Sequence, residues 1–285
     1  ITNLVKKDYN HPCVIMYSIG NEIPETGNKF DAQWGKKLAD KLRSLDDSRY
    51  VTNSLNLMLS IMDRLGEMKE QMEAQAEANA KDTDGKDLGE NAEINSMMSS
   101  LGDMMNMLIG SEIAGNATEE AFAQVDIAGY NYAQCRYESD AKSYPNRIIV
   151  GSETFPKDLD ENWELVEKHP YVIGDFSWTA WDYLGEAGIG KILYEEQPGM
   201  GFYAPYPYKA AYCGDLNLLG DRRPVSYWRE MIWGLRKAPY LSVQLPQYYG
   251  ITPQMTNWSM TNAVRSWNWN GYEGKPVVVE VYTDA

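Results

Sequence analysis

The stretch VIMYSIGNEIPET, residues 14–26, indicates a buried strand that ends at an acidic residue. Its first six residues are apolar or small, which is typical of a strand covered on both faces in a parallel sheet. Gly20, Asn21 and Glu22 follow. In such sheets, polar residues just beyond the carboxyl end of a strand face the crevice where ligands bind. We therefore expect Glu22 at the mouth of a site, with Gly20 allowing a tight turn.

A second stretch has the same form. Residues 148–156 read IIVGSETFP, in which an apolar run and Gly151 lead to Glu153. Glu153 thus stands at the same point of its strand as Glu22. Two strand-end glutamates at one face of an α/β fold indicate chemistry carried out by a pair of carboxylates.

In the rest of the chain, segments with the hydrophobic pattern of strands alternate with segments that have the pattern of helices. Strands are expected at residues 14–19, 50–57, 125–132, 148–150 and 171–178, and helices at 30–45, 118–123, 160–168 and 226–237. We expect Thr118 to cap the start of its helix. The alternation of strands and helices predicts a parallel α/β sheet over the first 237 residues.

Three segments resemble glycoside hydrolase family 2, the group that contains β-galactosidases and β-glucuronidases. HPCVIMYSIGNE, residues 11–22, is similar to the family's acid/base segment, and IIVGSETF to its nucleophile strand. VIGDFSWTAWDYLGEAGIG, residues 172–190, is similar to the eighth barrel strand and the following loop. The segments occur in the family's order, so the resemblance is specific.

The resemblance implies a fold and domain order. Residues 1–240 match strands four to eight of a (β/α)8 TIM-type barrel, which has eight strands when complete. Residues 241–285 contain alternating β-runs at 264–270 and 276–285, and we expect the truncated start of an antiparallel β-sandwich domain. A five-strand arc leaves unpaired edges, so we do not expect the chain alone to form a complete, active barrel.

The resemblance also implies roles for the two glutamates. Glu22 is expected to be the acid/base and Glu153 the nucleophile of a retaining mechanism, with carboxyl groups about 5–5.5 Å apart. Burial and the negative charge of Glu153 would keep a proton on Glu22. Asn21 is expected to bind the sugar's 2-hydroxyl group.

Other predicted substrate-binding residues lie at later strand ends. Tyr132 is expected to donate a hydrogen bond to Glu153, with Tyr137 as the alternative, and Asn131 to reach the sugar or a neighbouring side chain. Trp178 is expected to form the floor on which the sugar stacks. Trp181 and Asp182, in the loop that follows, are expected to contact its hydroxyl groups.

A methionine-rich segment at residues 58–117 interrupts the α/β alternation. Nine of the 14 methionines lie between Met58 and Met107. Their spacing predicts a helical hairpin whose methionine faces pack on each other or on the barrel. A promiscuous binding surface or a subunit contact is the alternative interpretation.

Composition excludes several classes of function. The formal net charge of −15 in a chain of 285 residues argues against nucleic acid and anionic membrane surfaces as partners, because both need a basic surface. The chain has only two histidines and three widely spaced cysteines, so we expect no metal site, no cofactor and no histidine-based triad. Cys13 is expected to be a small core residue. We expect a homo-oligomer as one possible state and a periplasmic or secreted location for the whole protein.

The sequence therefore predicts a hydrolase, a retaining exo-β-glycosidase that cleaves terminal β-linked sugars. By resemblance, a β-galactoside is the first choice of substrate, with a β-glucuronide or another β-glycoside as further choices. The alternative is a non-catalytic carbohydrate-binding or scaffold fragment, inactive because its barrel is incomplete.

Overall fold

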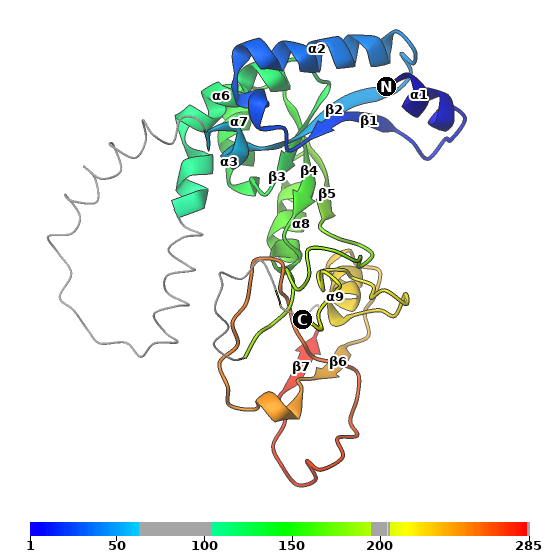
Figure 1. Cartoon of the computed structure of the whole chain (residues 1–285), viewed down its shortest axis with the longest axis vertical. Coiled ribbons are helices and arrows are strands. Elements are labelled where there is room, and N and C mark those ends of the chain that lie inside the picture. The colour runs from blue at the N-terminus through cyan, green and yellow to red at the C-terminus, as the bar shows by residue number, and fades with distance from the viewer. Residues whose placement is uncertain (63–103, 195–203, 205, 284–285) are drawn as a thin grey trace, which may run out of the picture. The chain divides into compact units, whose positions relative to one another are not determined.

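The computed structural model describes residues 1–62, 104–194, 204 and 206–283 (Figure 1). Its internal contacts divide it into two compact units. The first unit contains residues 1–152 and 169–174, and the second contains residues 153–168 and 175–285. Each unit is described by itself below.

A five-stranded sheet has the strand order β1-β2-β3-β4-β5, and all of it except the last residues of β4 and β5 belongs to the first unit. The strands are β1 (Met16–Asn21), β2 (Tyr50–Asn56), β3 (Ile127–Asn131), β4 (Ile148–Thr154) and β5 (Val172–Ser177). β1 pairs with β2, and β2 with β3, in parallel. The predicted parallel α/β sheet is confirmed, and in the described residues it forms an open arc and not a closed barrel.

Burial differs between the edge and the centre of this sheet. All five residues of β3 are buried, as expected for a strand covered on both faces. In β1 the burial alternates: Tyr17 and Ile19 are buried, whereas Ser18 is exposed. The prediction that the first strand is covered on both faces is therefore wrong, because β1 lies at the edge of the described sheet and only one of its faces is packed.

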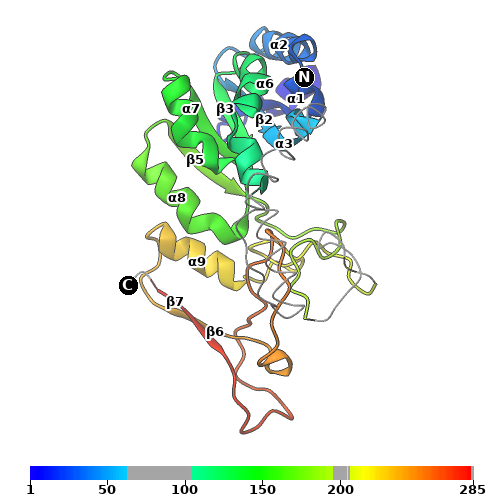
Figure 2. The same ribbon diagram turned by 90° about the vertical axis from the view of Figure 1, so that its left-hand side faces the viewer.

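The α-helices of this unit that have labels are α1 (Thr2–Asp8), α2 (Lys29–Arg43), α3 (Leu57–Ser60), α6 (Glu112–Phe122) and α7 (Tyr137–Ser143), and α2 contacts both β1 and β2. α2 and α6 pack against each other over the sheet (Figures 1 and 2). Ala39 and Leu42 of α2 meet Tyr17, Ile19 and Val51 in the core. This packing fixes the strand ends that carry the predicted site.

Two local predictions in this unit need correction. Thr118 does not cap α6, because it lies inside the helix and its hydroxyl donates to the carbonyl of Ala114 at 2.8 Å. The cap is Ser111, whose hydroxyl oxygen accepts from the amide of Ala114. Cys13 is not a core residue but is exposed, since it lies in the loop before β1.

The second unit combines helices α8 (Leu159–Lys168) and α9 (Pro224–Ile232) with a small antiparallel sheet. The two helices lie side by side (Figure 2), and the rings of Trp163 and Trp233 are 5.1 Å apart. The small sheet pairs β6 (Tyr240–Val243) with β7 (Val279–Tyr282). The β-run expected at residues 264–270 is reduced to a bridge between Val264 and Val243. A β-sandwich domain beyond residue 240 stays a prediction.

Most of the methionine-rich segment lies outside the described residues. Residues 104–110 at its end are helical, with Leu108 and Ile109 buried. The hairpin and its alternatives therefore stay predictions. In the described part of the chain, no helix is long and apolar enough to span a membrane.

Candidate active site

Glu22 lies directly after β1 in an unusual backbone conformation. Its φ is 51°, in the left-handed region that few residues other than glycine adopt. Its amide donates to the carbonyl of Ser54 at 2.8 Å, which ties this turn to β2. The tight turn therefore falls at Glu22 and not at Gly20. Gly20 instead makes room for Ile23, whose side chain lies 2.6 Å from where a Cβ would stand.

Two neutral amides hold the Glu22 carboxyl group. The Nδ2 atoms of Asn56 and Asn131 donate to its Oε1 at 2.9 and 3.1 Å. Asn56 ends β2 and Asn131 ends β3. Glu22 itself is half-buried. Three neighbouring strand ends thus converge on one carboxyl oxygen.

Asn131 is the centre of this network. Its side chain is fully buried, and its Nδ2 also donates to Oδ1 of Asn21 at 3.1 Å. The hydroxyl of Ser152 in β4 donates to its Oδ1 at 2.7 Å. This last bond sets the orientation of the amide, so that Nδ2 faces Asn21 and Glu22. Because Oδ1 of Asn21 accepts from Asn131, the exposed Nδ2 of Asn21 is turned away from this bond.

Of the residues predicted for this part of the site, Asn21, Glu22 and Asn131 are brought together. Tyr132 follows directly and is half-buried, with a φ of 54°. Asn56 was missed by the sequence reasoning. The signal was present, because Asn56 is the last residue but one of the predicted strand 50–57, as Asn131 is of the predicted strand 125–132.

The second unit carries the remaining predicted residues. Glu153 is half-buried at the carboxyl end of β4. The carbonyl of its neighbour Thr154 accepts from the amide of Trp178 at 2.9 Å. The strand ends that carry Glu153 and Trp178 are therefore joined by a backbone hydrogen bond.

Trp178 is fixed by a chain of polar and aromatic contacts. Its Nε1 donates to the hydroxyl of Tyr183 at 3.0 Å, and that hydroxyl donates to Glu186. Burial, and then Glu186, raise the pKa of Tyr183 well above its usual value, so the hydroxyl keeps its proton at neutral pH. The indoles of Trp178 and Trp258 both pack against a small core formed by Ile189, Ala211 and Cys213.

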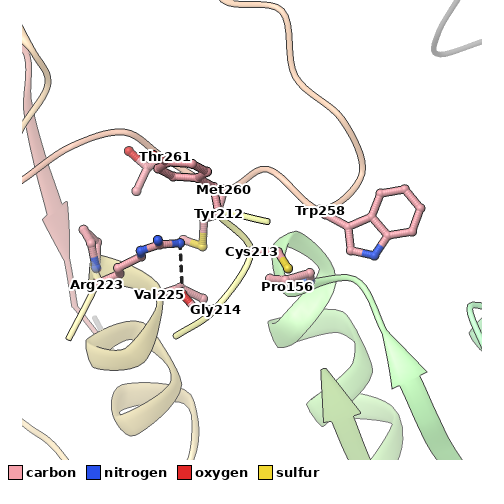
Figure 3. Close-up of a pocket in the computed structure, with 10 residues that line it drawn as sticks. Pro156, Tyr212, Cys213, Gly214, Arg223, Val225, Trp258, Met260 and Thr261 are labelled. Atoms are coloured by element: carbon pink, nitrogen blue, oxygen red, sulfur yellow. Dashed lines mark hydrogen bonds between the residues drawn. The ribbon is translucent and has the colours of Figure 1, made fainter. Parts of the chain in front are cut away.

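A small cavity borders this core (Figure 3). Cys213 and Trp258 line it together with Pro156 and Met260. Its volume of about 20 Å³ is enough for a single water molecule. Burial raises the pKa of the Cys213 thiol to about 12, so this cysteine remains a thiol at neutral pH and contributes packing to the core.

Asp182 and Trp181 lie in the loop after β5. The carboxylate of Asp182 is fully buried and accepts from Arg223 at 2.6 Å. Its other oxygen accepts from the amides of Tyr183 and Tyr212 at 3.1 and 2.9 Å. Trp181 is 55% exposed, and its ring passes close to Gly220. These contacts give Asp182 a role in shaping the loop, and its contact with a sugar stays a prediction.

The arrangement around Glu22 is suited to proton transfer. Both described hydrogen bonds to its carboxyl group fall on Oε1, which leaves Oε2 as the oxygen that can hold or accept a proton. In the described part of the chain, no group of three or more His, Cys, Asp or Glu residues could hold a metal ion.

Comparisons with known proteins show which family the chain resembles in sequence and fold. Residues 1–106 match the family model described as "Glycosyl hydrolases family 2, TIM barrel domain". Two solved structures of family 2 members are similar, one from Bacteroides cellulosilyticus (34% identity, TM-score 0.68) and one from B. cellulosilyticus DSM 14838 (31%, 0.61). Each comparison covers 98% of this chain, and 28% and 26% of the relative. Beta-galactosidase BoGH2A from Bacteroides ovatus is 21% identical over 85% of this chain and 29% of that protein. The chain thus spans less than a third of the length of these relatives.

Proposed function

Because this chain belongs to family 2 of the glycosyl hydrolases, we propose that it carries the two catalytic glutamates of a retaining exo-β-glycosidase. The family acts on glycosidic bonds, so a carbohydrate is the class of substrate. The observation that carries the proposal is the amide network around Glu22, built from the ends of β1, β2 and β3. A carboxyl group held by neutral donors at the carboxyl end of parallel strands is suited to general acid/base catalysis.

The proposed reaction has two steps. In the first, the Glu153 carboxylate attacks the anomeric carbon, the glycosidic bond breaks, and Oε2 of Glu22 gives its proton to the leaving oxygen. In the second, Glu22 takes a proton from water, and the resulting hydroxide attacks the anomeric carbon and releases Glu153. The anomeric configuration is retained because two displacements occur.

The network supports specific roles for the asparagines. Asn131 turns Oδ1 of Asn21 inward, so that Nδ2 of Asn21 is available to donate to a sugar hydroxyl. Asn56 and Asn131 occupy Oε1 of Glu22, which directs proton transfer to Oε2. A hydrogen bond from Asn21 to the sugar's 2-hydroxyl group can strengthen in the transition state. Trp178, held by Tyr183, offers an aromatic face on which a sugar ring can stack.

The substrate we propose first is a terminal β-galactoside, with a β-glucuronide or another β-glycoside as further choices. The chain is similar to a protein named a beta-galactosidase. Hydrolysis of 4-nitrophenyl β-galactoside and 4-nitrophenyl β-glucuronide, measured side by side, separates these choices. If wild-type protein binds sugar but cleaves neither substrate, and binding survives Glu22→Gln, the non-catalytic alternative replaces this proposal.

Replacement of Glu153 is the main test. Glu153→Gln should lower hydrolysis at least about a thousandfold, because the covalent step then lacks its nucleophile. Glu25→Gln is the matched control, since it removes an exposed acid near Glu22 and should leave the rate unchanged. Full activity in Glu153→Gln would disprove the assignment.

A further inference from the structure

A large cavity in the second unit is lined by Asp182 but by none of Glu153, Trp178 and Trp181. Its volume is about 650 Å³, within the range of sites that bind small molecules (about 300–1,000 Å³). The walls come from the segments after β5, from the start of α9 and from residues 240–265. All described lining residues belong to this unit. The cavity is therefore a second place where a ligand could bind.

Tyrosines form much of its wall. The rings of Tyr194 and Tyr248 are stacked 3.8 Å apart, and Asn262 donates to the Tyr194 hydroxyl. Tyr208 and Tyr212 meet edge to face at 5.9 Å. Tyrosine combines a flat apolar face with a polar edge, and this suits the apolar faces and hydroxyl groups of a sugar ring.

The cavity is also basic, in contrast to the chain as a whole. Among the described lining residues, four have a cationic side chain and two have a carboxylate, whereas the complete chain carries a formal net charge of −15. The cationic residues are Lys191, Arg222, Arg223 and Arg265, and the acidic ones are Asp182 and Asp221. A local reversal of charge of this kind attracts anions.

Two of the cations are already paired. Arg223 binds Asp182 at 2.6 Å and lies beside Tyr212 (Figure 3). Arg222 binds Glu230 at 2.9 Å.

The other two cations are placed to bind a ligand. Lys191 and Arg265 have no acidic partner among the described residues. The ammonium group of Lys191 lies 3.4 Å from the centre of the Tyr208 ring, a cation–π contact that holds it against the wall.

We propose that this cavity binds an anionic saccharide, a sugar unit that carries a carboxylate or a sulfate ester. Lys191 and Arg265 bind its charge, and the tyrosines pack against its ring. The inference rests on the proposed function, because a β-glycosidase encounters saccharides. It adds to that function a site for acidic sugar units that does not include the catalytic glutamates.

Binding should be measured by calorimetry on the 285-residue chain carrying Glu153→Gln, so that no ligand is cleaved. The probes are methyl β-glucuronide, galactose 6-sulfate and neutral methyl β-galactoside. We expect at least one anionic probe to bind about tenfold more tightly than the neutral one, with an affinity that falls as salt is added. Which probe binds identifies the carboxylate or the sulfate as the preferred group. Equal affinity for all three probes, or no binding of the anionic ones, would overturn the proposal.

Two substitutions and one control locate the site. Lys191→Met and Arg265→Gln should each weaken binding of the anionic probe at least about fivefold. Lys209→Met removes a cation from an exposed neighbouring position outside the cavity and should leave the affinity for the anionic probe unchanged. Equal effects of Lys191→Met and Lys209→Met would contradict the proposal.

A final variant separates this site from the catalytic one. If Trp178→Ala abolishes anion binding while Lys191→Met does not, the ligand lies with the catalytic residues and the proposal is wrong. A chain that binds the anionic probe through Lys191 but hydrolyses no β-glycoside would retain this site and lose only the proposed function.

Discussion

Glu22 and Asp182 both follow a strand of the five-stranded sheet, yet their carboxyl groups differ in burial and in hydrogen-bond partners. Glu22 is half-buried and accepts hydrogen bonds from two neutral amides on one oxygen. Asp182 is fully buried, and its oxygens accept from Arg223 and from two backbone amides. Glu22 therefore keeps one carboxyl oxygen clear of the described hydrogen bonds, whereas both oxygens of Asp182 are occupied and hold the loop after β5 in place.

A position at or beyond a strand end does not by itself decide the role of a carboxyl group. The role of each carboxyl group depends on the hydrogen-bond and ion-pair partners that the fold places beside it. The partners of Glu22 come from neighbouring strand ends, so the sheet itself positions them. The partner of Asp182 lies 41 residues away at the start of α9.

The largest expected effect is on the Asp182 side of this comparison. Arg223→Met leaves a fully buried carboxylate without its ion pair and should lower the free energy of unfolding by about 3–5 kcal/mol. Lys36→Met is the matched control, because its pair with Asp40 is exposed and should be worth no more than about 0.5 kcal/mol. The free energy of unfolding of both variants is measured by urea denaturation. An equally small decrease in the two variants would show that the ion pair of Asp182 is not buried.

Asp175 in β5 adds a third environment to the comparison. Neither of its carboxyl oxygens has a hydrogen-bond partner in the described structure. Burial raises its pKa to about 6, an effect increased by Asp158. The nearby Thr154 hydroxyl and Arg229 lower the pKa of Asp175. The Thr154 hydroxyl does so although it makes no hydrogen bond of ordinary geometry.

This shift predicts a pH dependence of stability. The folded-state pKa of about 6 lies above the unfolded value of about 3.9. The native state therefore holds the proton more tightly, and its contribution is complete below pH ~4 and lost as the pH rises through 6. Asp175→Asn should remove this loss, which is on the order of 2–3 kcal/mol.

Unfolding of wild type and Asp175→Asn should be compared between pH 4 and 7. The variant should gain stability relative to wild type as the pH rises. Asp160→Asn, which neutralises an exposed carboxyl group on α8, should follow the wild-type profile. Parallel profiles for wild type and Asp175→Asn would show that Asp175 titrates normally.

The smallest effect concerns the orientation of Asn131. Ser152→Ala removes the hydroxyl that fixes its amide and should lower the free energy of unfolding by about 1 kcal/mol. Hydrolysis should fall several-fold, since the amide then holds Glu22 less firmly. Ser44→Ala, which removes an exposed hydroxyl on the end of α2, should change neither quantity. A rate unchanged in Ser152→Ala would break the proposed link between Ser152 and Glu22.

The sequence predicted the sheet better than it predicted the surroundings of the site. Hydrophobic runs located β1 to β5 because strand burial leaves a local pattern. The same rule placed Glu22 and Asn131 at strand ends, and applied to β2 it would have found Asn56. Cys13 was misjudged because an apolar run does not show where the packed part of an edge strand begins.

Contacts between segments that are far apart in the chain could not be predicted from the sequence. Trp258 packs against the same small core as Trp178, 80 positions earlier in the chain. Arg223 forms an ion pair with Asp182, which lies 41 residues before it. No local period encodes such pairs, since tertiary packing alone brings them together. The left-handed backbone of Glu22 was missed for another reason, because glutamate rarely adopts it.

The central claim is that Glu22 and Glu153 act as one catalytic pair. The most direct measurement is the separation of their carboxyl groups in a crystal structure with a sugar-derived inhibitor bound. The account predicts about 5–5.5 Å, with both groups facing the inhibitor. A separation of about 6.5–9.5 Å would indicate an inverting mechanism, and carboxyl groups in separate environments would show that the chain does not assemble the site. Either result would contradict the account.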